Sequence, residues 1–350
     1  MRQVNSCPDA IYLITYPRTG SNLLLKILNL PEQPHVAAQT KEGYYFHPPL
    51  KLRHEFGMFD RPLALWDQDC SRLLSQCFND CFEELDGHLK FANAMGKSLL
   101  VKEHAPWLID PAIQSEWIHS SQDEDEIRSA PTSEQAEHLE SQRLTNIPMP
   151  IENPTILPNE FLRQVSPTFL IRNPIASFPS HYRAMRDSWY GSADTFKESG
   201  NSYLKFNMTI RWSRMIYDWY DKQKSSCREN GMNKRPIVLD ADDIMTRPEV
   251  VIEYCNLVGL DSTKAKFSWK PLSSDKMDAM DPEFLRMKDT LHASDGVRQD
   301  KIAAGLSLVK EAVKWKKEFG EAEGAKLVKW VQAAMPDYEY MWARRLTLPN

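Results

Sequence analysis

The sequence predicts an α/β fold in which a parallel β-sheet is covered by helices on both faces. Short apolar runs of strand length recur along the 350 residues, and each ends in polar or turn residues. Longer segments with helical periodicity separate these runs. Strands buried on both faces form continuous apolar runs, and long helical connections are what parallel strands require. With 42% hydrophobic and 26% charged residues, the chain has the composition of an ordinary globular domain.

Four apolar runs are candidate strands: Ile11 to Thr15, Ser98 to Lys102, Thr168 to Arg172 and Ile237 to Asp240. A turn containing Pro17 and Gly20 follows the first run, and a leucine-rich segment follows the turn. We expect this segment to be a helix that Pro31 ends, because proline cannot continue a helix. The chain therefore starts with a strand, a loop and a helix.

The C-terminal region has the spacing of amphipathic helices. The pattern over Glu311 to Met335 predicts one or two helices, interrupted near Gly320 and closed by Pro336. We interpret the chain as a single domain that spans residues 1–350. Its C-terminal helical segment, residues 300–350, packs on the rest of the domain. No internal repeat is visible.

The formal net charge of −5 has a local origin. Residues 121–143 hold seven carboxylates and two arginines, which account for the whole acidic excess. We expect this insert to be a disordered excursion or a charged surface helix, forming a mobile flap at the rim of the site. A chain without a basic tract is not expected to bind nucleic acid.

Several function classes lack their sequence signals. No stretch approaches the roughly 20 apolar residues of a membrane span, and the N-terminus has no secretion signal, so we expect a cytoplasmic protein without a membrane partner. The six cysteines form no C-x-x-C pair and lack histidines at metal-ligand spacing, which predicts reduced thiols and no metal site. Neither G-x-G-x-x-G nor a Walker A motif occurs.

The loop after the first strand is a candidate anion site. A strand that leads through Gly20 into a helix points backbone N–H groups and the positive end of the helix dipole at a bound anion. Thr19 and Ser21 add hydroxyl donors, and the Arg18 guanidinium suits phosphate or sulfate oxygens. The alternative interpretation is a tight turn with a capping serine.

Two other strand ends also carry polar side chains. Lys102 and His104 stand at the end of the second strand, whereas Arg172 ends the third strand and Ser180 follows eight residues later. Ligands of open α/β sheets bind at the carboxyl ends of the strands. We therefore expect these residues and the first loop to meet in one crevice.

These motifs resemble those of the sulfotransferase superfamily over most of the chain. YPRTGSNLL resembles the 5′-phosphosulfate loop, VKEHAP the strand end with the catalytic histidine, and IRNPIASFPSHY the 3′-phosphate motif. The runs at Asn153 to Leu162 and Pro179 to Arg183 resemble a fungal branch associated with secondary metabolism. The resemblance implies a three-layer P-loop-like fold, with 3′-phosphoadenosine-5′-phosphosulfate as the donor and no metal.

The resemblance also implies roles for individual residues. The residues that bind the 5′-phosphosulfate would be Arg18, Thr19, Gly20, Ser21 and Asn22. Arg172 and Ser180 would hold the 3′-phosphate. His104 would be the general base that takes the proton of an acceptor hydroxyl, and Lys102 with Arg18 would stabilise charge on the leaving oxygen. The implied acceptor is a small hydrophobic hydroxyl compound.

Three features depart from the family pattern. Leu23 stands where the cytosolic members place an adenine-stacking tryptophan. The C-terminal loop that closes over the donor is missing, and the segment Ser294 to Arg298 is its only substitute. Glu103 beside His104 adds a carboxylate that would suit acid/base work on a neutral substrate.

Glu103 supports a second hypothesis from another reaction class. The fold could have lost its nucleotide and use His104, Lys102, Arg18 and Glu103 for hydrolysis, cyclisation or lactone or pyrone formation on a polyketide-like intermediate. A third hypothesis is a non-catalytic scaffold, which the intact motif residues make the weakest. The sequence is compatible with a homodimer and does not decide the oligomeric state.

Some residues have two interpretations. The aromatic stretches Tyr44 to Pro48 and Ser188 to Tyr190 could line an acceptor pocket, although aromatic side chains more often belong to the core. His181 could be a second base or a core or surface histidine. Asp240, Asp242 and Asp243 could imitate a metal-binding Walker B site, but capping of the next helix is the preferred interpretation.

Overall fold

A parallel sheet forms the centre of the molecule. The computed structural model describes residues 10–37, 44–119, 152–188, 202–226, 236–278, 280 and 282–348. The strands are β1 (Ala10–Thr15), β2 (Leu99–His104), β3 (Ser166–Ile171) and β4 (Ile237–Asp240). They pair in parallel in the order β2-β1-β3-β4. This confirms the predicted α/β fold with a central parallel sheet.

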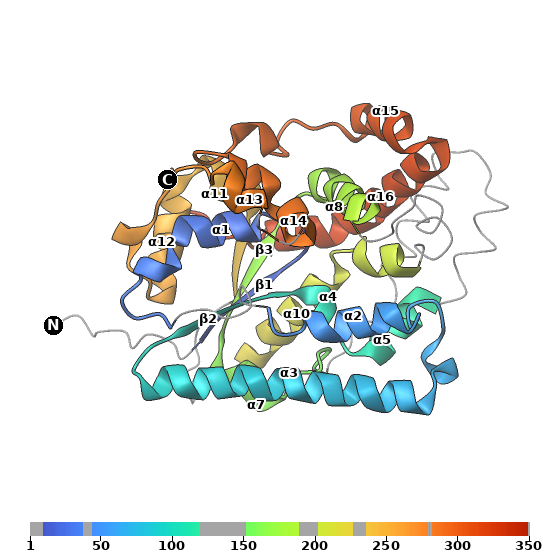
Figure 1. The fold of residues 1–350 in the computed structure, drawn as a ribbon, viewed down its shortest axis with the longest axis horizontal. Coiled ribbons are helices and arrows are strands. Elements are labelled where there is room, and N and C mark those ends of the chain that lie inside the picture. The colour runs from blue at the N-terminus through green and yellow to red at the C-terminus, as the bar shows by residue number, and fades with distance from the viewer. Residues whose placement is uncertain are drawn as a thin grey trace.

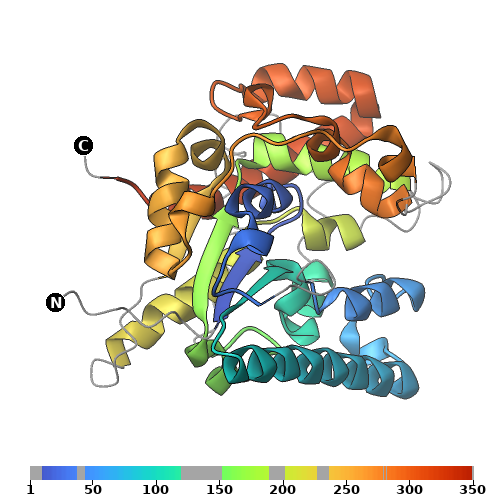
Figure 2. The same cartoon turned by 60° about the vertical axis from the view of Figure 1, so that its left-hand side comes forward.

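Two helical layers cover the sheet (Figures 1 and 2). Ile11 and Leu13 belong to one apolar cluster, whereas Tyr12 and Ile14 belong to the other, as expected for a strand buried on both faces. The first cluster includes α1 (Ser21–Leu28), α11 (Ala241–Thr246) and α12 (Pro248–Val258). The second includes α3 (Gln68–Ala94), α10 (Arg211–Ser226) and α16 (Glu321–Trp342).

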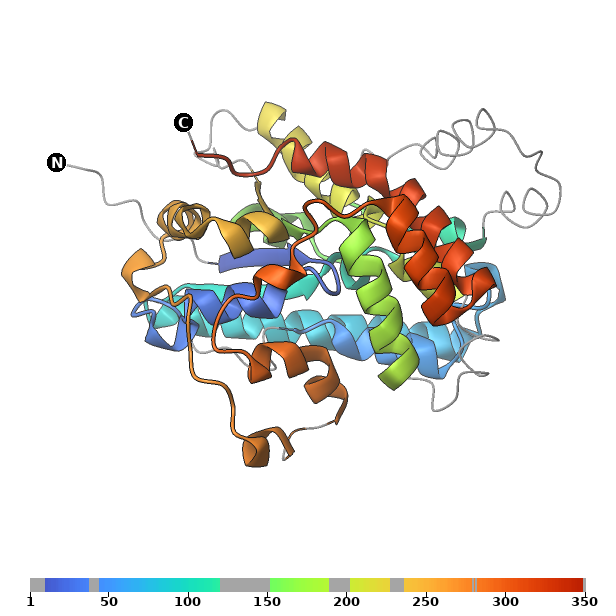
Figure 3. The same cartoon turned by 90° about the horizontal axis from the view of Figure 1, so that it is seen from above.

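Most of the other helices that the structure describes surround the carboxyl edge of the sheet, whereas the short helix directly before β3 lies at the amino edge. They are α2 (His47–Glu55), α4 (Ala105–Leu108), α5 (Pro111–His119), α7 (Asn159–Gln164), α8 (Pro174–Ser188), α13 (Ser274–Asp278), α14 (Pro282–Ala293) and α15 (Leu308–Phe319). Helices α15 and α16 pack on each other and on α8. Helix α14 contacts α1 and α8, and Figure 3 shows α13 and α14 standing outside the two layers.

The strand register aligns the strand ends. Thr15 at the end of β1 lies beside His104 at the end of β2. Ile171 at the end of β3 lies beside Asp240 at the end of β4. The loops that follow the strands therefore leave the sheet at the same edge. β2 extends two residues beyond its predicted end, so His104 still belongs to the strand.

Two prolines do not end helices where the sequence predicts. Helix α1 stops at Leu28, where Asn29 adopts a left-handed conformation, and Pro31 lies in the 3₁₀ turn η1 (Leu30–Glu32). The prediction that Pro336 closes the C-terminal helix is wrong, because α16 continues to Trp342.

Contacts beyond Pro336 account for this continuation. Asp337 pairs with Arg214 at 2.7 Å, and the Tyr338 hydroxyl donates to Asp240 at 3.1 Å. Met341 is fully buried. These tertiary contacts offset the loss of one helical hydrogen bond at the proline.

Some sequence predictions lie outside the described residues. The acidic insert 121–143 falls within 120–151, and Trp189 and Tyr190 fall within 189–201. The four cysteines in the described ranges are free thiols. In the part of the chain that the structure describes, no helix has both the length and the apolarity needed to cross a membrane.

Candidate functional site

The loop from β1 to α1 exposes the beginning of a helix to a cavity. Gly20 is the N-cap of α1 with a φ of 84°, and no side chain caps the first turn. The N–H groups of the first turn of a helix have no intrahelical partner, so they remain available to an anion. Arg18 has a φ of 66°, a conformation that costs a residue with a Cβ roughly 1–2 kcal/mol. Such strain is typical of functional loops.

The cavity has a volume of about 450 Å³ and lies at the carboxyl edge of the sheet. It is lined by the predicted loop residues Arg18, Thr19, Gly20, Ser21 and Asn22. His104 from β2, Arg172 after β3 and Ser180 from α8 line the same cavity. The structure thus brings together the residues that the sequence places at three separate strand ends.

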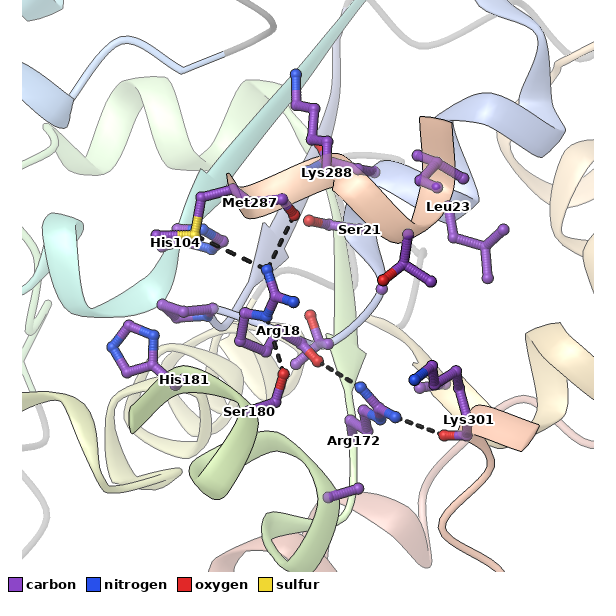
Figure 4. Close-up of a pocket in the computed structure, with 18 of the residues that line it drawn as sticks. Arg18, Ser21, Leu23, His104, Arg172, Ser180, His181, Met287, Lys288 and Lys301 are labelled. Atoms are coloured by element: carbon purple, nitrogen blue, oxygen red, sulfur yellow. Dashed lines mark hydrogen bonds between the residues drawn. The ribbon is translucent and has the colours of Figure 1, made fainter. Parts of the chain in front are cut away.

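Arg18 occupies the middle of this cavity (Figure 4). Its Nε donates to the Ser180 hydroxyl at 3.0 Å, and its terminal nitrogen donates to the Met287 carbonyl oxygen of α14 at 2.9 Å. In Figure 4, His104 and His181 lie on one side of Arg18, whereas Arg172 and Lys301 lie on the other. The guanidinium therefore separates a histidine-containing part of the cavity from a cationic part.

Arg172 ties two loops together at the cationic part. It donates to the Arg18 carbonyl oxygen at 2.9 Å and also to the Lys301 carbonyl oxygen. Asp242 fixes the second loop, because its carboxylate accepts from the backbone N–H groups of Ala303 and Ala304. Burial lowers the pKa of Arg172 from its usual value. The side chain is nevertheless cationic at neutral pH.

The hydrogen bonds of His104 determine its tautomer. The Thr15 hydroxyl donates to the Glu103 carbonyl oxygen at 3.0 Å and lies 2.7 Å from Nδ1 of His104. Since the hydroxyl has a single proton, Nδ1 must donate to it, which leaves Nε2 as an acceptor. The Tyr44 hydroxyl lies 3.0 Å from Nε2 and donates to it.

The surroundings of His104 keep it neutral. Burial and the nearby cation of Lys102 lower the pKa of His104 well below 6.5. Its Nε2 therefore has a lone pair at neutral pH. The geometry and the charge state both suit a general base.

Lys102 lies beneath the cavity and is not among the residues that line it. Its ammonium group donates to Asn22 Oδ1 at 2.6 Å and lies 4.0 Å from the ring centre of Tyr44. The side chain is fully buried. Lys102 thus links the first turn of α1 to Tyr44 and places a positive charge close to His104.

Glu103 does not reach the cavity, contrary to its expected role beside His104. Successive side chains of a strand point to opposite faces, so Glu103 faces away from Lys102 and His104. Its carboxylate accepts from the backbone N–H groups of Tyr45 and Phe46. Burial raises the pKa of Glu103 to about 8. Glu103 anchors the segment that carries Tyr44.

Glu103→Gln is expected to become more stable relative to the wild type as the pH rises. The folded pKa of about 8 lies above the usual 4.5, so the native state binds the proton more tightly and the Glu103 contribution is lost as the pH rises. Linkage gives a change in the stability difference on the order of 3 kcal/mol between pH 5 and pH 8. Glutamine keeps the accepting oxygen without ionising. Urea unfolding of both proteins at both pH values measures the difference, and a constant difference would contradict the assignment.

Sequence reasoning missed the aromatic wall beside His104. The Trp107 ring, on the short helix α4, lies 4.6 Å from the His104 ring. Tyr44 and His47 lie 5.1 and 5.2 Å from the same indole. Tyr44 and His47 come from the stretch that the sequence offered as a pocket lining, whereas Tyr45 and Phe46 belong to the core. The position of Trp107 three residues after His104 was the available signal.

Sequence reasoning also missed two cations. Lys288 on α14 and Lys301 line the cavity, together with Arg298 of the segment Ser294 to Arg298. No motif marks these residues, because they arrive on the long excursion that follows α12. Leu23 lines the cavity as well, at the position discussed for adenine contact.

The three aspartates after β4 are structural in the described part of the chain. Asp240 caps α11 by accepting from the N–H of Asp242 at 2.9 Å. Asp243 pairs with Arg345 at 2.8 Å, and Asp242 holds the loop described above. The capping interpretation is confirmed for Asp240.

Comparisons with known proteins found full-length relatives. No protein-family model matches the chain. The chain is 36% identical over 345 residues to the sulfotransferase ppzF of Metarhizium rileyi, covering 97% of this chain and 96% of the relative. The protein of the same name from Metarhizium majus is 36% identical over 347 residues, covering 97% of each. The solved sulfotransferase domain of the Synechococcus PCC 7002 olefin synthase covers 91% of this chain and 97% of that domain, with 13% identity and a TM-score of 0.37.

Proposed function

Because the chain belongs to the sulfotransferase family, with fungal relatives along nearly its whole length, we propose that it transfers a sulfuryl group from 3′-phosphoadenosine-5′-phosphosulfate to a hydroxyl of a small hydrophobic acceptor. The family makes it an enzyme of the transferase kind. The identity of the donor and the chemical class of the acceptor are our proposals.

The observation that carries the proposal is the position of Arg18. It lies between a cationic part of the cavity and a part that contains a neutral histidine. Transfer of a charged group needs anion-binding groups around the donor and a base beside the acceptor. A cavity divided in this way supports a reaction between an anionic donor and a neutral acceptor.

The residues of the cationic part fit the anionic groups of the proposed donor. The uncapped first turn of α1 and the guanidinium of Arg18 would hold the 5′-phosphosulfate. Arg172 and Ser180 would hold the 3′-phosphate, with Lys301 beside them. Lys288 adds a cation from α14. The donor supplies an activated sulfuryl group on a nucleotide leaving group.

The other part of the cavity would bind the acceptor. Trp107, Tyr44 and His47 offer aromatic surface for a hydrophobic body. His104 Nε2 would accept the proton that the acceptor hydroxyl loses, and Thr15 holds the imidazole in the tautomer for this task. In the structure the Tyr44 hydroxyl donates to Nε2, so an acceptor hydroxyl would take its place.

Nucleotide-independent acid/base catalysis loses its main support. The Glu103 carboxylate beside His104 was a feature that favoured this alternative, and Glu103 lies on the other face of β2. The cationic side chains that line the cavity favour an anionic donor over a neutral substrate. We therefore propose no second function.

The proposal is tested by calorimetric titration with 3′-phosphoadenosine-5′-phosphate, with 5′-AMP as the matched control that lacks the 3′-phosphate. We expect micromolar binding of the first nucleotide and much weaker binding of the second. Radiolabelled donor incubated with a panel of phenols and hydrophobic alcohols should then give labelled sulfate esters. Absence of nucleotide binding, together with a His104-dependent hydrolysis or cyclisation, would reject sulfuryl transfer.

A further inference from the structure

His181 is a buried histidine that forms no hydrogen bond with the described residues. It follows Ser180 on α8, is 3% exposed and lines the cavity. Neither ring nitrogen has a hydrogen-bond partner within the described ranges. Burial and the nearby Arg18 guanidinium lower the pKa of His181 to about 3, so the ring is neutral. A neutral imidazole has one donor and one acceptor, and here neither is used.

Asn207, which lines the same cavity, has a third polar atom with no partner among the described residues. It is fully buried at the end of the helix over 202–207. Its side-chain amide nitrogen donates to the Tyr203 carbonyl oxygen at 2.9 Å, which fixes the orientation of the amide. The Asn207 Oδ1 atom has no partner in the part of the chain that the structure describes. The oxygen can therefore accept a hydrogen bond from a bound ligand.

Such atoms require an explanation, because nearly all buried polar groups in native proteins form hydrogen bonds. Two helices, α8 and the helix over 202–207, carry three buried polar atoms that have no partner among the described residues, and both residues line one cavity. His181 lies on the same side of Arg18 as His104 (Figure 4), and the two histidines influence each other electrostatically. His181 thus belongs to the part of the cavity that we assign to the acceptor, and Asn207 lines the same cavity.

We propose that His181 and Asn207 bind a second polar group of the acceptor, one that is uncharged and both donates and accepts hydrogen bonds, such as a carboxamide or a hydroxyl. This proposal rests on the proposed function in one respect, namely that the bound molecule is the acceptor of the sulfuryl group. An ammonium group is disfavoured because Arg18 is close, and a carboxylate has no proton to donate to Asn207 Oδ1. The acceptor would therefore combine a reacting hydroxyl, an aromatic or apolar body and a neutral polar group.

The test uses matched pairs of probes, namely 3- and 4-hydroxybenzamide and the methylphenols of the same substitution pattern. Dissociation constants are measured by ligand-observed NMR, with and without saturating 3′-phosphoadenosine-5′-phosphate. We expect a hydroxybenzamide to bind the wild type about tenfold more tightly than its methyl partner. His181→Phe should remove this preference without weakening methylphenol binding. His181→Gln, which keeps a donor and an acceptor, should restore part of it.

Two further readouts separate binding from a structural role. His181→Phe should melt no lower than the wild type, because it removes two unpaired polar atoms and keeps the ring shape. In the wild type, the imidazole nitrogen signals of His181 should shift with the hydroxybenzamide and stay in place with the methylphenol. This second measurement needs no variant, so it remains decisive even if a substitution prevents folding.

Several results would overturn the assignment. They are equal affinity for the members of each probe pair, a preference that survives in His181→Phe, or failure of every hydroxybenzamide to bind with or without the nucleotide. Failure of the nucleotide itself to bind would instead count against sulfuryl transfer. The two proposals can therefore fail separately.

Discussion

His104→Asn should lower the rate of sulfuryl transfer by about 10²- to 10⁴-fold, the usual contribution of a positioned general base. Asparagine fits the space without clash but has no nitrogen lone pair to take the acceptor proton. Affinity for 3′-phosphoadenosine-5′-phosphate should stay within a few-fold, because Arg172, Arg18 and the first turn of α1 are unchanged. Initial rates with labelled donor and calorimetry with the nucleotide product measure the two quantities.

The pH profile gives this prediction a second readout. Burial and Lys102 hold the pKa of His104 well below 6.5, so the base is unprotonated across neutral pH. Protonation removes the lone pair, and the rate should therefore fall only when the pH drops well below 6.5. An acid limb centred at or above pH 6.5 would contradict the assignment of His104 as the base.

His47→Asn is the matched control. His47 lines the same cavity and its ring lies 5.2 Å from Trp107, so it shares the aromatic wall without the Thr15 hydrogen bond. Its loss should raise KM for a hydrophobic acceptor more than it lowers kcat. If His47→Asn and His104→Asn lowered kcat equally, the base would not be assigned to His104.

The fold and the centre of the site follow from local sequence signals. Each strand is an apolar run of the length that a doubly covered sheet requires, and the polar residue that ends the run marks the carboxyl edge. In a parallel sheet these ends must lie together, so Arg18, His104 and Arg172 could be assigned to one crevice without knowing the strand order. Side chains alternate between the two faces along a strand, so the sequence also predicts that Glu103 faces away from its neighbour His104.

Other parts of the site depend on contacts that are remote in sequence. Lys288 and Lys301 reach the cavity on a long segment after α12, and no local pattern records where such a segment returns. His181 and Asn207 become notable only because packing leaves their polar atoms without partners among the described residues. Pro336 is similar, since the salt bridge and hydrogen bond that keep α16 helical involve partners more than 90 residues away.

Arg172→Ala should weaken binding of 3′-phosphoadenosine-5′-phosphate by about 10- to 100-fold, the range expected for losing charge-assisted hydrogen bonds. Binding of 5′-AMP, which lacks the 3′-phosphate, should change little. Arg172→Lys should give an intermediate loss, because lysine keeps the charge but not the planar fork. Calorimetric titration of each variant with both nucleotides supplies the comparison.

Measuring both nucleotides distinguishes a contact between Arg172 and the 3′-phosphate from support of the loop before α1. Arg172 donates to the carbonyl oxygens of Arg18 and Lys301, so its loss could also loosen the loop that precedes α1. A loosened loop would weaken both nucleotides equally, whereas loss of a 3′-phosphate contact weakens only one. Arg183→Ala is the control for a lost positive charge in the cavity lining, because the charge of Arg183 is already paired with Glu318 and its loss should leave both affinities unchanged. Equal losses for both nucleotides in Arg172→Ala would therefore reassign Arg172 from donor recognition to loop support.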